Sequence, residues 1–70
     1  MTLEQRLAAA HAAGDAIALI EVYTEAAEAA PDVDTACFFL THAYVFALEA
    51  GDARAELLRT RLAAHGREPA

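Results

Sequence analysis

The chain has 70 residues, a net charge of −6 and a single cysteine, Cys37. A chain of this length forms one domain at most and buries only about 60% of the surface that its unfolded form exposes. The lone cysteine excludes a disulfide within the chain, and the acidic balance argues against nucleic acid as a partner, because phosphates require a basic surface.

Glycine, proline and aspartate divide the chain into four predicted helices. Gly-Asp occurs at residues 14–15 and 51–52, and Pro31 lies between them. Gly ends a helix in the left-handed conformation, a following Asp can cap the next helix, and Pro stops a helix. We expect helices over about residues 2–13, 16–30, 34–50 and 53–64, in one domain of residues 1–66 with a tail of residues 67–70. No segment alternates like a strand, so the predicted fold class is all-α, with two antiparallel hairpins.

The helix faces show which side chains should form the core. Thr2 and Gln5 have the spacing of a capping box at the start of the first helix. In the second helix, three acids share one face with Ile17, and the opposite face is apolar. The acids are Glu21, Glu25 and Glu28. The predicted core positions are Leu19, Val22, Tyr23 and Ala26 in the second helix, and Ala55, Leu58 and Leu62 in the fourth.

The segment "GDAIALIEVYTEAAEAAP" resembles the tetratricopeptide repeat, a unit of two antiparallel helices. The turn at residues 14–15, the aromatic Tyr23, the small Ala26 and the closing Pro31 match the family pattern. A second unit begins with Cys37, Leu40 and Tyr44, which match the spacing of its large residue, leucine and tyrosine. The resemblance implies a short right-handed superhelix whose groove binds peptides. A generic pair of helical hairpins remains the alternative.

The third predicted helix is apolar almost all the way round. Its broad face is formed by Cys37, Leu40, Ala43, Tyr44 and Ala47, and is extended by Phe39, Phe46 and Ala50 on one side and by Leu48 on the other. The second and fourth helices are expected to cover this face. The side of the helix that these two helices leave uncovered is a narrow line of residues spaced one helical turn apart. These residues are Phe38, His42, Val45 and Glu49. The resemblance places this line, together with Glu4 and His11 of the first helix, on the side that faces the groove.

Two explanations fit this line. The first helix covers it in a compact bundle, because a helix that is apolar all round is usually buried. Alternatively, it belongs to an exposed patch for another chain. The predicted partner-binding residues are then Phe38, Phe39, His42, Val45, Phe46, Glu49, Glu4 and His11. A homodimer is the commonest way to bury such a patch, and a docked peptide or partner helix is the next.

The residues that could carry chemistry do not form a recognisable motif. No two histidines lie three or four residues apart on one helix, so no helical metal pair exists. Cys37 and His42 point in different directions around their helix, and Cys37 between Ala36 and Phe38 resembles a buried apolar group more than a nucleophile. We therefore expect neither an enzyme nor a cofactor. A metal or small-molecule site would need His11 and His42 to converge between helices.

The sequence thus predicts a non-enzymatic interaction module. The alternative is a bundle that binds a metal or a small molecule. The least favoured hypothesis is a regulator that mimics nucleic acid through Glu21, Glu25 and Glu28. A signal peptide and a membrane span are not apparent, which predicts a cytoplasmic protein. Residues 53–70 hold four of the five arginines. These arginines either pair with acidic helices of their own chain or contact another subunit.

Overall fold

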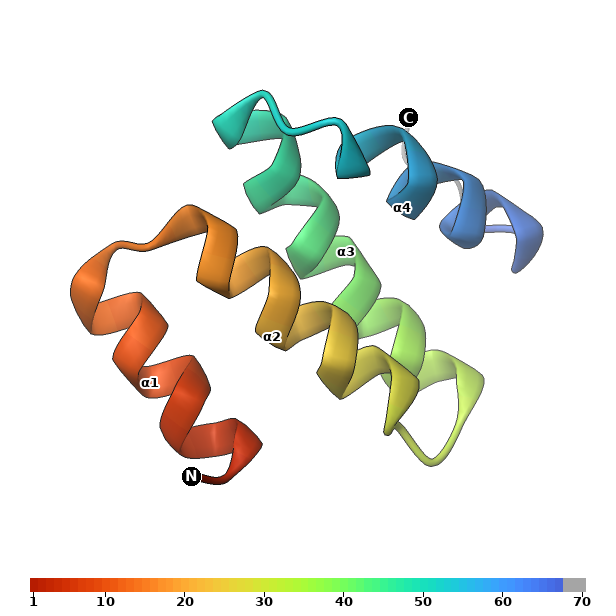
Figure 1. Ribbon diagram of the computed structural model, residues 1–70. Coiled ribbons are helices and arrows are strands. Elements are labelled where there is room, and N and C mark those ends of the chain that lie inside the picture. Colours follow the sequence, from red (N-terminus) through yellow and green to blue (C-terminus); the bar gives the residue numbers. More distant parts are fainter. Residues whose placement is uncertain (68–70) are drawn as a thin grey trace.

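The computed structural model describes residues 1–67, which form four helices joined by short turns (Figure 1). The helices are α1 (Leu3–Ala13), α2 (Ala16–Glu28), α3 (Val33–Ala50) and α4 (Arg54–Ala64). No strand occurs within residues 1–67. The predicted all-α fold class is therefore confirmed, and every helix boundary lies within two residues of its predicted position.

The beginning and end of α1 follow the local sequence signals. The Thr2 hydroxyl accepts a hydrogen bond from the Gln5 backbone N–H at 3.1 Å, and the Gln5 side chain accepts one from the Thr2 N–H at 2.9 Å. Gly14 ends the helix with a φ of 62°, a conformation that favours glycine. Asp15 then caps α2 by accepting a hydrogen bond from the backbone N–H of Ala18. The predicted capping box and Gly-Asp turn are confirmed.

The link between α2 and α3 differs slightly from prediction. α2 ends at Glu28, two residues earlier than expected. Ala30 precedes Pro31, and steric contact with the proline ring disfavours the helical conformation at that position. Asp32 caps α3 by accepting a hydrogen bond from the Thr35 N–H at 2.7 Å, so α3 begins at Val33.

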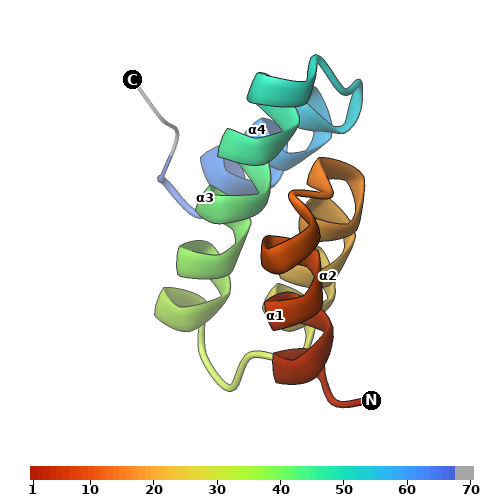
Figure 2. The same cartoon turned by 90° about the vertical axis from the view of Figure 1, so that its left-hand side faces the viewer.

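Each helix packs against the next one in chain order, so α1 contacts α2, α2 contacts α3 and α3 contacts α4. The Cα atoms extend over 32 × 29 × 14 Å, which makes the molecule a slab about two helices thick. Figures 1 and 2 show α2 lying across one side of α3, with α1 and α4 on either flank. α1 does not pack against α3, so the alternative of a compact bundle closed by the first helix is not observed.

The core lies where α3 meets α2 and α4. Its largest fully buried side chains are Ile20, Leu40 and Leu62. The predicted core positions of α2 and α4 are buried, except that Ala26 and Ala55 are half-buried. Ile20 was not predicted in the core, although it is wholly buried against α3. None of the helices in residues 1–67 has the length and apolarity needed to cross a bilayer.

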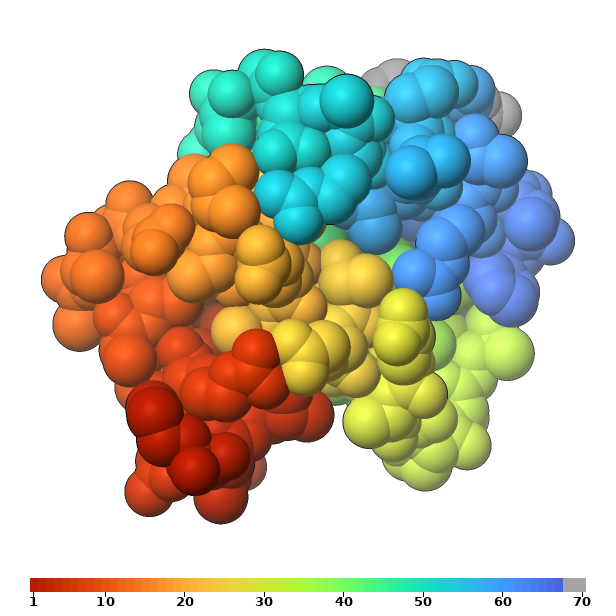
Figure 3. Space-filling model, in the orientation of Figure 1, coloured from red at the N-terminus to blue at the C-terminus, as the bar shows by residue number. Residues whose placement is uncertain are grey.

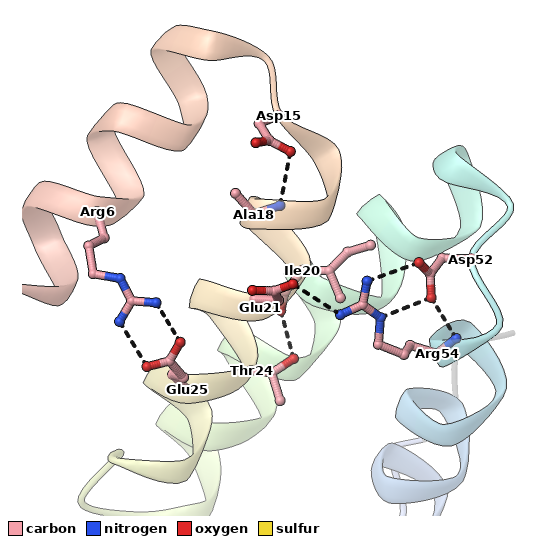
Figure 4. Close-up of polar contacts among 9 residues, drawn as sticks. All are labelled: Arg6, Asp15, Ala18, Ile20, Glu21, Thr24, Glu25, Asp52 and Arg54. Carbon is pink, nitrogen blue, oxygen red and sulfur yellow. Dashed lines mark hydrogen bonds and ion pairs between the residues drawn. The ribbon is translucent and has the colours of Figure 1, made fainter.

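Arginines connect the outer helices to the acidic face of α2 (Figure 4). The Arg6 guanidinium donates two hydrogen bonds to Glu25, at 2.6 and 2.8 Å, which lowers the pKa of that carboxyl. Arg54 of α4 lies 3.7 Å from Glu21. The other arginine pairs are Arg61 with Glu28, Arg59 with Glu56, and Arg67 with Asp34. The basic end of the chain thus pairs with acids of its own chain, as the first explanation of the charge distribution predicts.

The predicted tail of residues 67–70 is described only at its first residue. The guanidinium of Arg67 pairs with Asp34 at the start of α3, and its backbone N–H donates a hydrogen bond to the Leu62 carbonyl at 2.8 Å. Residues 68–70 lie outside the described part of the chain. Arg67 is therefore joined to the helical domain by contacts with both α3 and α4.

Candidate functional site

One face of α3 carries large apolar side chains that residues 1–67 leave exposed. Phe38 is 58% exposed and Val45 is 44% exposed, and both belong to the predicted line. Leu48, one turn after Val45, is 55% exposed although it was predicted on the covered face. The apolar surface of α3 is wider than the two helices that pack on it can cover. We call Phe38, Val45 and Leu48 the α3 strip.

Tyr23 of α2 lies beside this strip at the centre of a cluster of rings. Its own ring is buried, and the ring of His42 stacks on it with centroids 5.0 Å apart. Phe46 stacks at 5.8 Å, and Phe39 lies tilted at 6.2 Å. Phe39, His42 and Phe46 are half-buried by these contacts. These three predicted partner-binding residues therefore help to hold α3 on α2, and each leaves only part of its surface accessible.

The two histidines predicted to face the same groove both contact Tyr23. The Nε2 atom of His11 lies 3.0 Å from the Tyr23 hydroxyl oxygen, and the His11 ring meets Phe46 edge-on at 5.9 Å. His42 donates a hydrogen bond from Nδ1 to the Phe38 carbonyl at 2.9 Å. Because that carbonyl can only accept, Nδ1 carries the proton of this hydrogen bond. Tyr23 was predicted as a core residue only, and nothing in the sequence indicated that it would bring the histidines together.

Among the hollows that adjoin the Tyr23 cluster, two have a volume of about 310 Å³ each. The first lies between α1 and the end of α2, where Figure 3 shows a recess between the two helices. Its lining is mostly apolar and consists of Leu3, Glu4, Leu7, Val22, Ala26, Ala29, Ala30, Pro31 and Phe39. The second lies on α3 and is lined by Thr41, His42, Val45, Phe46 and Glu49. Phe39 and Phe46 are two turns apart on α3, so the hollows follow one another along this helix.

Each hollow contains one carboxylate that lacks an ion pair. Glu4 lines the first hollow and Glu49 the second, and both side chains belong to exposed residues. Neither has a salt-bridge or hydrogen-bond partner among residues 1–67. In contrast, the acids on the outer face of α2 are matched with arginines. Two carboxylates without an ion pair in residues 1–67 thus line the hollows beside the aromatic cluster.

The described residues do not assemble a metal centre. Within residues 1–67, no three His, Cys, Asp or Glu side chains come together as metal ligands. Cys37 lies on the buried face of α3, and only 2% of its surface is exposed. His11 and His42 converge on Tyr23, as the alternative site required, but no third ligand joins them in this part of the chain.

No family model matches the chain, and no curated protein or solved structure shows significant similarity to it. The resemblance to tetratricopeptide repeats therefore depends on the residues of the chain alone.

Proposed function

We propose that this chain is a non-enzymatic interaction module of tetratricopeptide-like type that binds another polypeptide on the open side of α3. The observation that carries the proposal is the exposure of the α3 strip, where Phe38 and Val45 lie together on a helix that is otherwise well packed. Single exposed apolar residues are common on protein surfaces, but a row of them beside half-buried aromatic rings is typical of an interaction site.

The arrangement of the helices supports this proposal. α1 packs on α2 and not on α3, and the rings of His11 and Phe46 meet edge-on between α1 and α3. An extended peptide or an amphipathic helix can lie along the α3 strip, beside the half-buried rings that pack on Tyr23. Full burial of one Phe or Val side chain contributes about 1.5–3 kcal/mol. The strip residues are already about half-buried, so a partner that covers them gains only part of that amount from each.

The alternative of a metal- or small-molecule-binding bundle has one observation in its favour, which is the convergence of His11 and His42 on Tyr23. This site supplies two imidazoles, whereas a metal centre in a protein usually takes three or four protein ligands. The nitrogen of His11 nearest the cluster is also engaged by the Tyr23 hydroxyl. The exposed strip therefore favours a polypeptide partner over a metal ion.

The proposal is tested by placing a charge on the strip. We expect Phe38→Asp to abolish binding of a protein partner, because it places a carboxylate where apolar surface is to be buried. Leu57→Asp is the matched control, since Leu57 is 67% exposed on α4 and lies outside the strip. Binding is measured by capture from cell extract with immobilised protein, followed by binding assays with the purified partner, and self-association by sedimentation velocity.

The outcome depends on the difference between the two variants. A partner, or a second copy, that binds wild type and Leu57→Asp but not Phe38→Asp supports the proposal. A wild-type monomer at high micromolar concentration that captures nothing beyond what Phe38→Asp captures contradicts it. Circular dichroism at 222 nm shows whether either variant has lost helical structure.

A further inference from the structure

We propose that the partner of the α3 strip is a second copy of this chain, which packs its own α3 on the strip in the antiparallel direction. This inference rests on the proposed function and specifies the partner. The sequence already favoured a homodimer. The structure adds the helix that forms the contact, the direction of the second helix and the residues that face each other.

The exposed residues of α3 have the spacing that packs one helix along another. Phe38, Thr41, Val45 and Leu48 follow one another at steps of three, four and three residues, and all four are exposed. Such steps keep side chains in one line along a helix, as in the seam of a coiled coil. The Thr41 hydroxyl donates a hydrogen bond to the Cys37 carbonyl at 2.8 Å, so covering Thr41 leaves no donor unsatisfied.

This line of four residues is complementary to itself when a second copy is turned about a two-fold axis. Thr41 and Val45 are equally far from Ala43 along the helix, and so are Phe38 and Leu48. A two-fold axis level with Ala43 and perpendicular to α3 reverses the direction of the second helix. It sets Phe38 opposite the partner's Leu48, and Val45 opposite the partner's Thr41. Each pair occurs twice in a symmetric interface, so every residue of the strip meets an uncharged residue in both copies.

The charges along α3 favour the antiparallel direction over the parallel one. Residues 35–48 include no Asp, Glu, Lys or Arg. In a parallel pair, Glu49 would lie beside the partner's Glu49, and like charges at an interface oppose association. In the antiparallel pair these two carboxylates are twelve residues apart along the helix axis, about 18 Å, which exceeds the screening length of about 8 Å at physiological salt. Glu49 comes level with the partner's Cys37, which lines the same hollow as the cationic Arg67.

The exposed area and the rigidity of the strip suit a small reversible dimer. Phe38 is 58% exposed, and a buried phenylalanine covers about 150–250 Å², so the two Phe38 rings offer roughly 170–290 Å² together. A specific interface needs about 1,000 Å² in total, and Val45, Leu48 and their neighbours on α3 add to the area of the rings. The partner's α3 is already helical, so it loses less freedom on docking than a flexible peptide does. We expect a dissociation constant in the micromolar range.

Self-association is measured by sedimentation velocity of the full chain from low to high micromolar concentration. We expect wild type to shift from monomer to dimer over this range. Phe38→Asp and Leu48→Asp should each raise the dissociation constant at least ten-fold, because a symmetric contact buries every introduced carboxylate twice. Leu57→Asp is the matched control on α4 and should dimerise like wild type. Circular dichroism at 222 nm shows whether each variant keeps its helices.

The direction of the second helix is tested by disulfide formation. Thr41→Cys and Val45→Cys are each made in a Cys37→Ala background and oxidised in a glutathione buffer, separately and as an equal mixture. We expect a linked dimer that contains one chain of each kind. Identical residues are offset by about 6 Å along the axis, in addition to the distance between the helices, which exceeds the span of a disulfide. Leu57→Cys mixed with Thr41→Cys shows the background from random collision.

The results separate this inference from the proposed function. If wild type stays monomeric but captures another protein that Phe38→Asp does not capture, the inference is wrong and the proposed function stands. If each cysteine variant links to itself more readily than to the other, the helices run parallel, so the inference is again wrong and the proposed function stands. If a dimer forms that neither Phe38→Asp nor Leu48→Asp weakens, the dimer uses another face and the inference is wrong.

Discussion

At the scale of single residues, Asp52 in the turn between α3 and α4 has the best-defined electrostatic role. Its carboxylate accepts hydrogen bonds from the backbone N–H of Arg54 at 2.8 Å and from the Arg54 guanidinium at 2.9 and 3.0 Å. These hydrogen bonds stabilise the ionised carboxylate and lower the pKa of Asp52 from 3.8 to about 2. The residue was predicted to cap α4, but the N-cap of α4 is Ala53, which has no side-chain capping hydrogen bond. The Asp52 carboxylate lies one residue earlier and holds Arg54 instead.

This lowered pKa predicts how stability depends on pH. Because the pKa of Asp52 is lower in the folded chain than in the unfolded chain, its contribution is fully present above about pH 4 and is lost as the pH falls through about 2. Asp52→Asn should lower the melting temperature at neutral pH, and its difference from wild type should shrink between pH 4 and pH 2. Thermal unfolding followed by circular dichroism at several pH values measures this difference.

Arg54→Gln is the matching variant, because it removes the side-chain donor that lowers the pKa of Asp52. It should therefore also make the melting temperature depend less on pH between pH 4 and pH 2. A melting-temperature difference between Asp52→Asn and wild type that stays constant from pH 7 to pH 2 would show that the ionised carboxylate does not stabilise the fold.

At the scale of the elements, the two Gly-Asp turns set where the hairpins reverse. Gly14 and Gly51 have φ values of 62° and 65°, and a Cβ placed on either would meet no atom within 4 Å. Replacement by alanine therefore costs only the left-handed backbone conformation and creates no clash. The two turns are thus equivalent in geometry, although Gly14 joins α1 to α2 and Gly51 joins α3 to α4.

We predict that Gly14→Ala and Gly51→Ala each reduce the free energy of unfolding by about 1–2 kcal/mol, the usual cost of the left-handed conformation for a residue with a Cβ. Gly51→Asn should cost less, because asparagine enters this region more readily. Urea unfolding monitored at 222 nm measures all three. Equal stability of wild type and Gly51→Ala would mean that the turn adopts another conformation in solution.

At the scale of the whole molecule, the linear order of helix contacts makes stability uneven. α3 packs on both α2 and α4 and buries four residues, whereas α1 packs on α2 alone and buries only Ala10 among its described residues. Two polar contacts hold α1 on α2, the exposed ion pair between Arg6 and Glu25 and the hydrogen bond between His11 and Tyr23. Exposed ion pairs contribute little, so α1 should open more readily than the rest of the chain.

Hydrogen exchange followed by NMR checks this expectation. Amides in the middle of α3 should exchange most slowly, and those of α1 should exchange fastest among the four helices. Arg6→Gln should accelerate exchange in α1 and leave α3 unchanged. Equal protection in α1 and α3 would show that the chain unfolds only as a single unit.

The candidate site could be predicted in part from the spacing of residues on one helix. Phe38 and Val45 lie on the narrow line that the helical period separates from the broad apolar face, and both are exposed. The exposure of Phe39 and Phe46 could not be predicted in the same way. They lie at the edge of the broad apolar face, where burial depends on how the neighbouring helix packs. Tyr23 covers them on one side and leaves them half-buried.

The sequence by itself determined the four helices, their ends and most of their buried faces, because these features depend on periodicity, capping and turn residues that act over a few positions. Only the tertiary structure decided that α1 stays apart from α3, that Leu48 is exposed and that His11 and His42 meet at Tyr23. A helical wheel gives the direction of a side chain but not the neighbour that lies there. That neighbour depends on the angles at which helices cross, and these angles are set by the packing of the whole chain.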